Sequence, residues 1–240
     1  MLIPVMQNRY VGDIGDYAKY ALLRAIGREH QLGVAWYLYP DEGHNADGKH
    51  TSYLDAPAQW RDLDPDLFDG LKSLVSQDQR CVDSIERAQL LPSGQFHSRV
   101  LSSDLRTYGE RAAWRQQWFE HVLSDLGECN FVFADPDNGL CGDERFRAGR
   151  RKDWKRLPIS EARALAEGRT AVIYHHNSRW PGGHEAEIRH WMSELGEGTM
   201  ALKWSAYGSR TFFVMNAPAD MQGRLNAFAA DWGSKASLFR

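Results

Sequence analysis

The sequence predicts an α/β fold in which helices cover both faces of a doubly wound, mostly parallel sheet. Short apolar runs alternate with segments of helical periodicity along the chain, at residues 33–39, 131–134 and 170–174. Each run is apolar at consecutive positions and ends in polar residues, which is typical of strands buried on both faces of a parallel sheet. The chain has 240 residues, enough for one domain of this class, which we expect to span residues 1–240.

The helices are predicted from apolar residues that recur at helical spacing. Asp16 is the candidate N-cap of the first helix, over residues 17–30. The longest helix is expected over residues 104–126, with Trp114 and Trp118 on its core-facing stripe. Further helices are expected near residues 64–75, 80–91, 160–167 (capped by Ser160), 185–195 and 220–232, and a further strand at residues 96–101. The first two of these lie in a helical insertion at about residues 55–95.

Two strands near the end of the chain, at residues 200–204 and 211–216, flank a turn at Gly208 and predict an antiparallel β-hairpin. The alternation of strands and helices, closed by this hairpin, predicts a Rossmann-like sheet of the class I methyltransferase kind.

Composition excludes several classes of protein. The chain is 42% hydrophobic and 25% charged, which is ordinary for a soluble globular protein. The net charge of -3 means that any basic surface must be local. Three cysteines without metal-finger spacing predict reduced thiols and a cytoplasmic location. Because no apolar run approaches the roughly 18 residues of a spanning helix, we expect no association with a membrane.

Polar residues follow three of the predicted strands where each strand ends. Residues 135–139 read Asp-Pro-Asp-Asn-Gly, a strong turn signal, and residues 40–48 form a second acidic loop with glycines. His175 and His176 end the strand at residues 170–174; because neighbouring strand residues point to opposite faces, we expect one of them to enter a site. Ligands of open α/β sheets bind at this carboxyl edge. A turn that only ends the strand is the alternative for residues 135–139.

Four segments, in order, resemble the bacterial large-subunit ribosomal RNA adenine-N6 methyltransferases. Residues 10–20, Tyr-Val-Gly-Asp-Ile-Gly-Asp-Tyr-Ala-Lys-Tyr, are similar to the glycine loop and helix that open that family. Residues 36–48 fall where the family has a strand and its cofactor glycine loop, residues 133–138 where it has Asp-Pro-Pro-Tyr, and residues 210–218 at its closing strand. Asp137 and Asn138 stand where the family has its second proline and its aromatic residue.

The resemblance implies a nucleic-acid base-modifying transferase that uses S-adenosylmethionine to methylate a base amine. Asp135 would accept a hydrogen bond from the amine and align its lone pair with the methyl donor. The catalytic candidates are Asp135, Asp137, Asn138 and His175. The cofactor-binding candidates are Lys19, Asp41, Glu42, Gly43 and Gly48. The substrate-binding candidates are Tyr10, Asp13, Arg150, Arg151, Trp154 and His176.

Residues 143–156 contain seven lysines and arginines against three acidic residues. Such a stretch favours a phosphate-bearing partner, DNA or RNA, and Trp154 and Trp180 are candidates to stack on a base. A solvated charged surface is the alternative for this basic stretch.

Three other functions use the same residues. One is a transferase that adds a group from another donor to a modified base in DNA, as virus-encoded hypermodification enzymes do. Another is a nuclease that binds Mg²⁺ or Mn²⁺ through Asp135 and Asp137, with His175 or His176 nearby. The last is a nucleic-acid-binding protein without catalytic activity.

Overall fold

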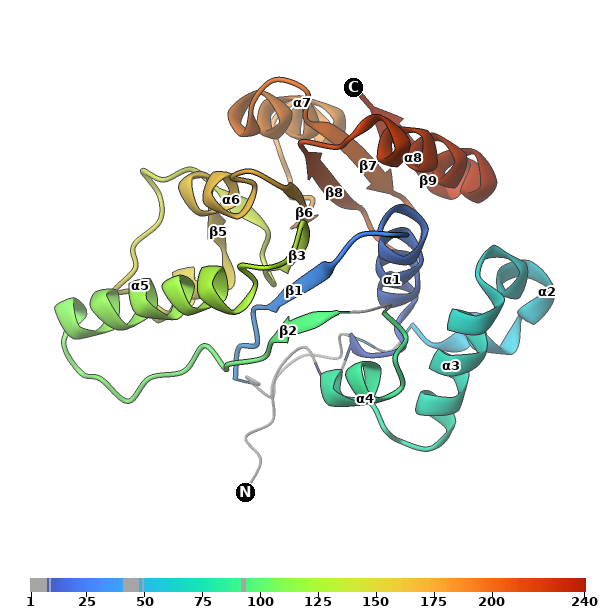
Figure 1. Ribbon diagram of the computed structural model, residues 1–240, viewed down its shortest axis with the longest axis horizontal. Helices are drawn as coiled ribbons and strands as arrows, with labels where there is room; N and C mark the ends of the chain where they lie inside the picture. The colour runs from blue at the N-terminus through green and yellow to red at the C-terminus, as the bar shows by residue number, and fades with distance from the viewer. Residues whose placement is uncertain (1–7, 9, 41–47, 49, 92–93) are drawn as a thin grey trace.

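The computed structural model describes residues 8, 10–40, 48, 50–91 and 94–240. Their centre is a seven-stranded sheet in the order β2-β1-β3-β6-β8-β7-β9 (Figure 1). The strands are β1 (Leu32–Trp36), β2 (Gln95–His97), β3 (Phe131–Asp135), β6 (Thr170–His176), β7 (Met200–Trp204), β8 (Arg210–Met215) and β9 (Ala236–Phe239). The first four strands in the sheet order are parallel, β8 is antiparallel to both β6 and β7, and β9 is antiparallel to β7. The predicted α/β fold with a mostly parallel sheet is therefore confirmed.

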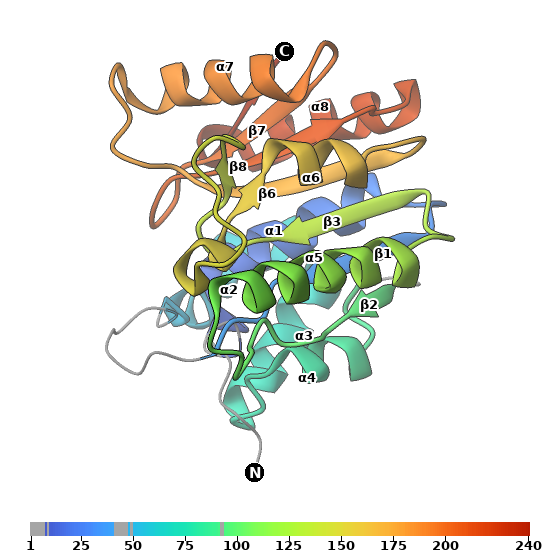
Figure 2. The ribbon, with the colours of Figure 1, turned by 90° about the vertical axis from the view of Figure 1, so that its left-hand side faces the viewer.

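Helices cover both faces of this sheet (Figures 1 and 2). The helices of one face are α1 (Ile14–Ile26), α3 (Pro65–Ser76), α4 (Val82–Arg87) and α8 (Ala219–Trp232). Those of the other face are α5 (Tyr108–Asp125), α6 (Ile159–Leu165) and α7 (Gly183–Leu195). Strand β3 contributes Phe131 and Phe133 to the first hydrophobic core and Val132 and Ala134 to the second. Its continuous apolar run thus follows from burial on both faces.

The register of the parallel strands brings their carboxyl ends together. Trp36 at the end of β1 pairs with Asp135 at the end of β3. Strand β6 lies on the other side of β3 and ends at His176, which pairs with Arg210 at the start of β8. Asp135 at the end of β3, His176 at the end of β6 and Arg210 at the start of β8 therefore lie at one edge of the sheet.

Two predicted N-capping residues are wrong. The first helix begins at Ile14 and its N-cap is Asp13, because the Asp13 carboxylate accepts a hydrogen bond from the Gly15 amide. It ends at Ile26, earlier than predicted, with Gly27 as the C-cap. Helix α6 begins at Ile159, so Ser160 lies inside it. The Ser160 amide and hydroxyl donate to Asp143.

Residues between β1 and β2 form short helices: η2 (Ser52–Asp55), α2 (Pro57–Trp60), η3 (Arg61–Leu63), α3 and α4. Three strands have no counterpart in the sequence prediction: β9 and the parallel pair β4 (Leu140–Cys141) and β5 (Leu157–Pro158). A two-residue strand is too short to leave a periodic pattern. Within the described part of the chain, no helix is both long enough and apolar enough to cross a membrane.

Candidate functional site

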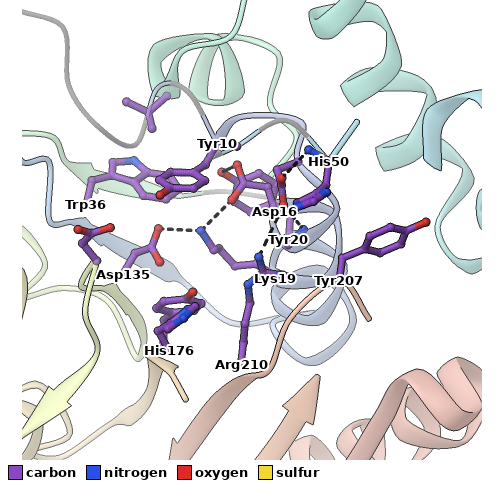
Figure 3. A pocket seen from close by; sticks show the side chains of 16 residues that line it. Tyr10, Asp16, Lys19, Tyr20, Trp36, His50, Asp135, His176, Tyr207 and Arg210 are labelled. Carbon is purple, nitrogen blue, oxygen red and sulfur yellow. Dashed lines mark hydrogen bonds and ion pairs between the residues drawn. The ribbon is translucent and has the colours of Figure 1, made fainter. Parts of the chain in front are cut away.

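A cavity of about 320 Å³ opens at the carboxyl edge of the sheet, beside the N-terminal half of α1 (Figure 3). Strands β1, β3, β6 and β8 and the turn between β7 and β8 each contribute to its wall. The lining residues are Tyr10, Asp13, Gly15, Asp16, Lys19, Tyr20, Trp36, Gly48, His50, Val82, Asp135, Asp137, Tyr174, His176, Tyr207 and Arg210. Carboxylates and aromatic rings dominate this set.

Lys19 lies between two carboxylates in this cavity. Its ammonium nitrogen is 2.8 Å from Asp135 Oδ2 and 2.9 Å from Asp16 Oδ1, and its side chain is only 10% exposed (Figure 3). The rings of Tyr20 and Tyr174 lie 5.6 and 5.5 Å from the same nitrogen, in cation–π geometry. Three charged groups from two distant parts of the chain thus form one buried cluster.

Burial and the neighbouring charges shift the pKa values of Asp16 and Lys19 in opposite directions. Burial raises the pKa of Asp16 from 3.8 to about 6, against the Lys19 ammonium, which lowers it. Burial lowers the pKa of Lys19, but the Asp135 and Asp16 carboxylates outweigh it and hold that pKa above its ordinary value. Lys19 is therefore an ammonium at neutral pH. Of Lys19 and Asp16, it is Asp16 whose pKa lies near neutrality.

Asp13 holds the loop that precedes α1. Its Oδ1 accepts from the Gly15 amide at 2.9 Å, and its Oδ2 accepts from the His50 amide at 3.0 Å. The Arg210 guanidinium lies 3.7 Å from Asp13 and directly over Gly15, where an added Cβ would be 2.5 Å from Arg210 Cζ. Glycine at position 15 therefore allows Arg210 to reach the cavity, and the predicted substrate residue Asp13 has a structural role in the same wall.

Of the three polar side chains in the Asp-Pro-Asp-Asn-Gly turn, only the two aspartates line the cavity. Asp135 and Asp137 line it, and Lys155 Nζ lies 3.5 Å from Asp137 Oδ2. The Asn138 side chain is exposed and is not among the lining residues, whereas its backbone N–H donates to the Lys155 carbonyl at 2.8 Å. Asn138, a predicted catalytic residue, thus lies outside the cavity.

The two histidines at the end of β6 point to opposite faces of the sheet. His176 lines the cavity. His175 is buried on the other side, where Nδ1 accepts from the Leu140 amide at 3.0 Å and Nε2 lies 3.1 Å from Glu187 Oε1. His175, a predicted catalytic residue, therefore lies outside the cavity, and its ring joins β4 and α7 to the sheet.

The basic stretch divides into exposed and buried residues. Arg150 and Arg151 are exposed, and Arg151 donates to backbone carbonyls of the segment before α5. Trp154 is fully buried and stacks on Trp114, with ring centroids 4.9 Å apart. The prediction that Trp154 stacks on a base is wrong, because its apolar ring belongs to the core.

The remaining predicted residues fall in two groups. Tyr10, Lys19 and Gly48 line the cavity. Asp41, Glu42 and Gly43 lie outside the described residues. Sequence reasoning did not identify several lining residues, namely Tyr20, Trp36, His50, Tyr174, Tyr207 and Arg210. Tyr207 carries a recognisable signal in the sequence, because it stands next to the turn glycine Gly208. In the structure, 52% of its surface is exposed.

Among the described residues, no group of three or more histidine, cysteine or acidic side chains is arranged to hold a metal ion. The Lys19 ammonium lies between the Asp16 and Asp135 carboxylates in the cavity wall. No protein-family model matches the chain, and no curated protein sequence matches it.

Gly139 closes the turn at a point where only glycine fits. Its φ is +70°, and an added Cβ would lie 2.4 Å from His175 Nδ1 and 2.8 Å from His175 Cα. We expect Gly139→Ala to lower the free energy of unfolding by about 1–3 kcal/mol more than a matched control, because overpacking adds to backbone strain. The control is Gly168→Ala, where φ is also +70° but no described atom lies within 4 Å of the added Cβ. Equal losses in urea denaturation of the two variants would contradict the close approach.

Proposed function

We propose that this chain is a transferase that modifies nucleic acid bases, and that it moves the methyl group of S-adenosylmethionine to a base amine. The observation that carries the proposal is Asp135, a carboxylate at the carboxyl end of a central strand, inside a cavity lined with aromatic rings. A hydrogen bond from the amine to Asp135 would orient the nitrogen lone pair, and positioning supplies much of the acceleration of such a transfer. Lys19 holds the carboxylate in place from the side of α1.

The strand order supports the proposal. Strand β8 runs antiparallel between β6 and β7, as the closing strand does in the class I methyltransferase variant of the Rossmann sheet. The cavity lies at the edge where ligands of open α/β sheets bind. If the resemblance holds, Asp135 and Pro136 correspond to the first two residues of the Asp-Pro-Pro-Tyr motif of that family.

The residues of the cavity suit a cationic ligand. S-adenosylmethionine supplies a methyl group bound to a positively charged sulfur. Carboxylates attract such a charge, and aromatic faces bind cations. Trp36 at the end of β1 and Gly48 after it are the described residues that would hold the cofactor. The cavity of about 320 Å³ reaches the lower end of the range for small-molecule sites.

The rim of the cavity suits a base that arrives from outside. Tyr207 is half exposed and lies beside His50, with ring centroids 5.6 Å apart. Exposed rings of this kind stack on bases without sequence preference. The exposed Arg150 and Arg151 follow the Asp-Pro-Asp-Asn-Gly turn in sequence and would bind phosphates.

Calorimetric titration with S-adenosylmethionine tests the choice of donor. We expect saturable binding to one site, and we expect Trp36→Ala to weaken it at least about tenfold, the equivalent of roughly 1.4 kcal/mol. Trp180→Ala is the control for loss of a tryptophan outside the cavity, because the partly buried Trp180 stacks on His190 and does not line the cavity. No detectable binding to the wild-type chain would remove S-adenosylmethionine from the proposal.

A second expectation concerns the basic stretch. We expect the double variant Arg150→Gln, Arg151→Gln to bind single-stranded polynucleotides more weakly. The slope of log K against log salt should also be smaller by about 1–2, because fewer counterions are released. The control is Arg28→Gln with Lys72→Gln, two exposed residues outside this stretch. Equal affinity and slope in the two double variants, measured by fluorescence anisotropy, would identify the exposed part of the basic stretch as an ordinary solvated surface.

A further inference from the structure

We propose that Asp16 is the final acceptor of the proton that the base amine loses during transfer, and that Lys19 carries this proton from Asp135 to Asp16. This inference rests on the proposed transferase function and extends it, because it assigns a path for the proton. It concerns side chains of α1 and β3 that the described structure already connects.

The path is a continuous chain of hydrogen bonds in the cavity wall. Lys19 Nζ donates to Asp135 Oδ2 at 2.8 Å and to Asp16 Oδ1 at 2.9 Å. Tyr20 extends it, since its hydroxyl donates to Asp16 Oδ2 at 3.1 Å. All four residues line the cavity, and their side chains are almost entirely buried except for that of Lys19, which is 10% exposed. A proton that enters at Asp135 can therefore reach Asp16 without crossing a gap.

The proton balance of the step is simple. When the amine nitrogen forms its new bond to carbon, the electron pair of the broken bond stays with the leaving group, and the nitrogen must lose one proton. Asp135 takes that proton. Lys19 gives one of its three protons to Asp16 and receives the one on Asp135, so that Lys19 ends as the ammonium it was before. The net result is one proton moved from the amine to Asp16, with Asp135 again a carboxylate.

The surroundings of Asp16 suit a proton acceptor. The groups that face it are Lys19, Tyr20 and Asp13 from its own segment, Asp135 from β3 and Tyr53 from η2. With both carboxylates ionised, the cluster of Asp16, Lys19 and Asp135 carries one net negative charge, which a proton neutralises. Burial raises the pKa of Asp16 to about 6, so that Asp16 is ionised and able to accept at pH 8 and protonated at pH 5.

The pH profile of the transfer rate in a single turnover tests the path. We expect the wild-type rate to rise as the pH rises through about 6 and then to level off. In Asp16→Asn the asparagine oxygen still accepts from Lys19 but cannot take a proton, so we expect a rate about 10²-fold lower at pH 8 and no rise near pH 6. In Tyr20→Phe the loss of the donor to Asp16 raises the Asp16 pKa, so the rise should move to higher pH.

A second measurement does not depend on turnover. Infrared difference spectra of the cofactor-free protein should show a carboxyl group that takes up a proton with a midpoint near pH 6, and this signal should be missing in Asp16→Asn. Thermal melting of both variants verifies that they fold.

Failure of the proposed transferase function and failure of the proton path would give different experimental results. If the wild-type chain transfers nothing, the proposed function fails and the proton path falls with it. If the wild-type chain transfers a methyl group and Asp16→Asn matches its rate and pH profile, the proposed function stands and the proton path is overturned. An infrared signal that persists unchanged in Asp16→Asn also overturns it.

Discussion

Replacing Lys19 with methionine should lower the free energy of unfolding by about 3–5 kcal/mol, because removal of one partner leaves buried charges uncompensated. Methionine keeps much of the volume and length of the lysine side chain. It leaves the Asp16 and Asp135 carboxylates close together with no cation between them. The measurement is chemical denaturation at pH 8, with Lys72→Met as the control for an exposed lysine on a helix.

The loss in Lys19→Met should depend on pH in a defined direction. Lys19 lowers the pKa of Asp16, so its removal raises the pKa of that carboxyl in the folded protein further above the unfolded value. A group whose folded pKa is raised contributes stability below its unfolded pKa and loses it as the pH rises through the folded pKa. The deficit of the variant should therefore be largest above pH 7 and smaller near pH 5.

A second substitution verifies the cause of the loss. Asp16→Asn introduced into Lys19→Met removes one of the two uncompensated charges, so it should restore part of the lost stability. A loss below about 1 kcal/mol in Lys19→Met, the range of an exposed ion pair, would contradict the buried cluster.

Replacing Asp135 with alanine should reduce methyl transfer to nucleic acid by at least about 10²-fold, because the amine loses the group that orients it. Lys19 keeps Asp16 as a partner in this variant, so the chain should still fold. Asp104→Ala removes an exposed carboxylate outside the cavity and is the control for charge. Full activity in Asp135→Ala, with binding and folding unchanged, would show that the reaction takes place elsewhere.

Much of the architecture could be predicted from the sequence. The apolar run at residues 131–134 is read correctly as a strand because burial on both faces removes the need for polar positions. Trp118 packs in the core as its spacing indicates, and the partly buried Trp114 packs against that core. Helix α1 starts three residues before the predicted position, at Ile14. Asp13 and Asp16 are equally good capping residues, and only the fold shows which carboxylate reaches the Gly15 amide.

The site is less predictable from the sequence than the strands and helices are, because its contacts join residues that lie far apart in the chain. Asp135 is recognisable in the sequence because two carboxylates follow the apolar strand directly. The role of Lys19 depends on a contact across 116 positions of the chain, which no local pattern encodes. Trp154 and His175 stand in polar segments that suggest exposure, yet both rings turn into the core. The direction of a side chain in a short 3-10 helix or at a strand end depends on its neighbours in space.

The most direct test of the central claim is mass spectrometry of nucleosides after incubation with S-adenosylmethionine that carries a deuterated methyl group. Single-stranded DNA and RNA are each treated with the wild-type chain and with Asp135→Ala, then digested to nucleosides. We predict a base nucleoside with the labelled methyl group in one of the two nucleic acids, formed by the wild-type chain and reduced at least about 10²-fold by the variant. The absence of labelled nucleosides from both nucleic acids after treatment with the wild-type chain would contradict methyl transfer to a base.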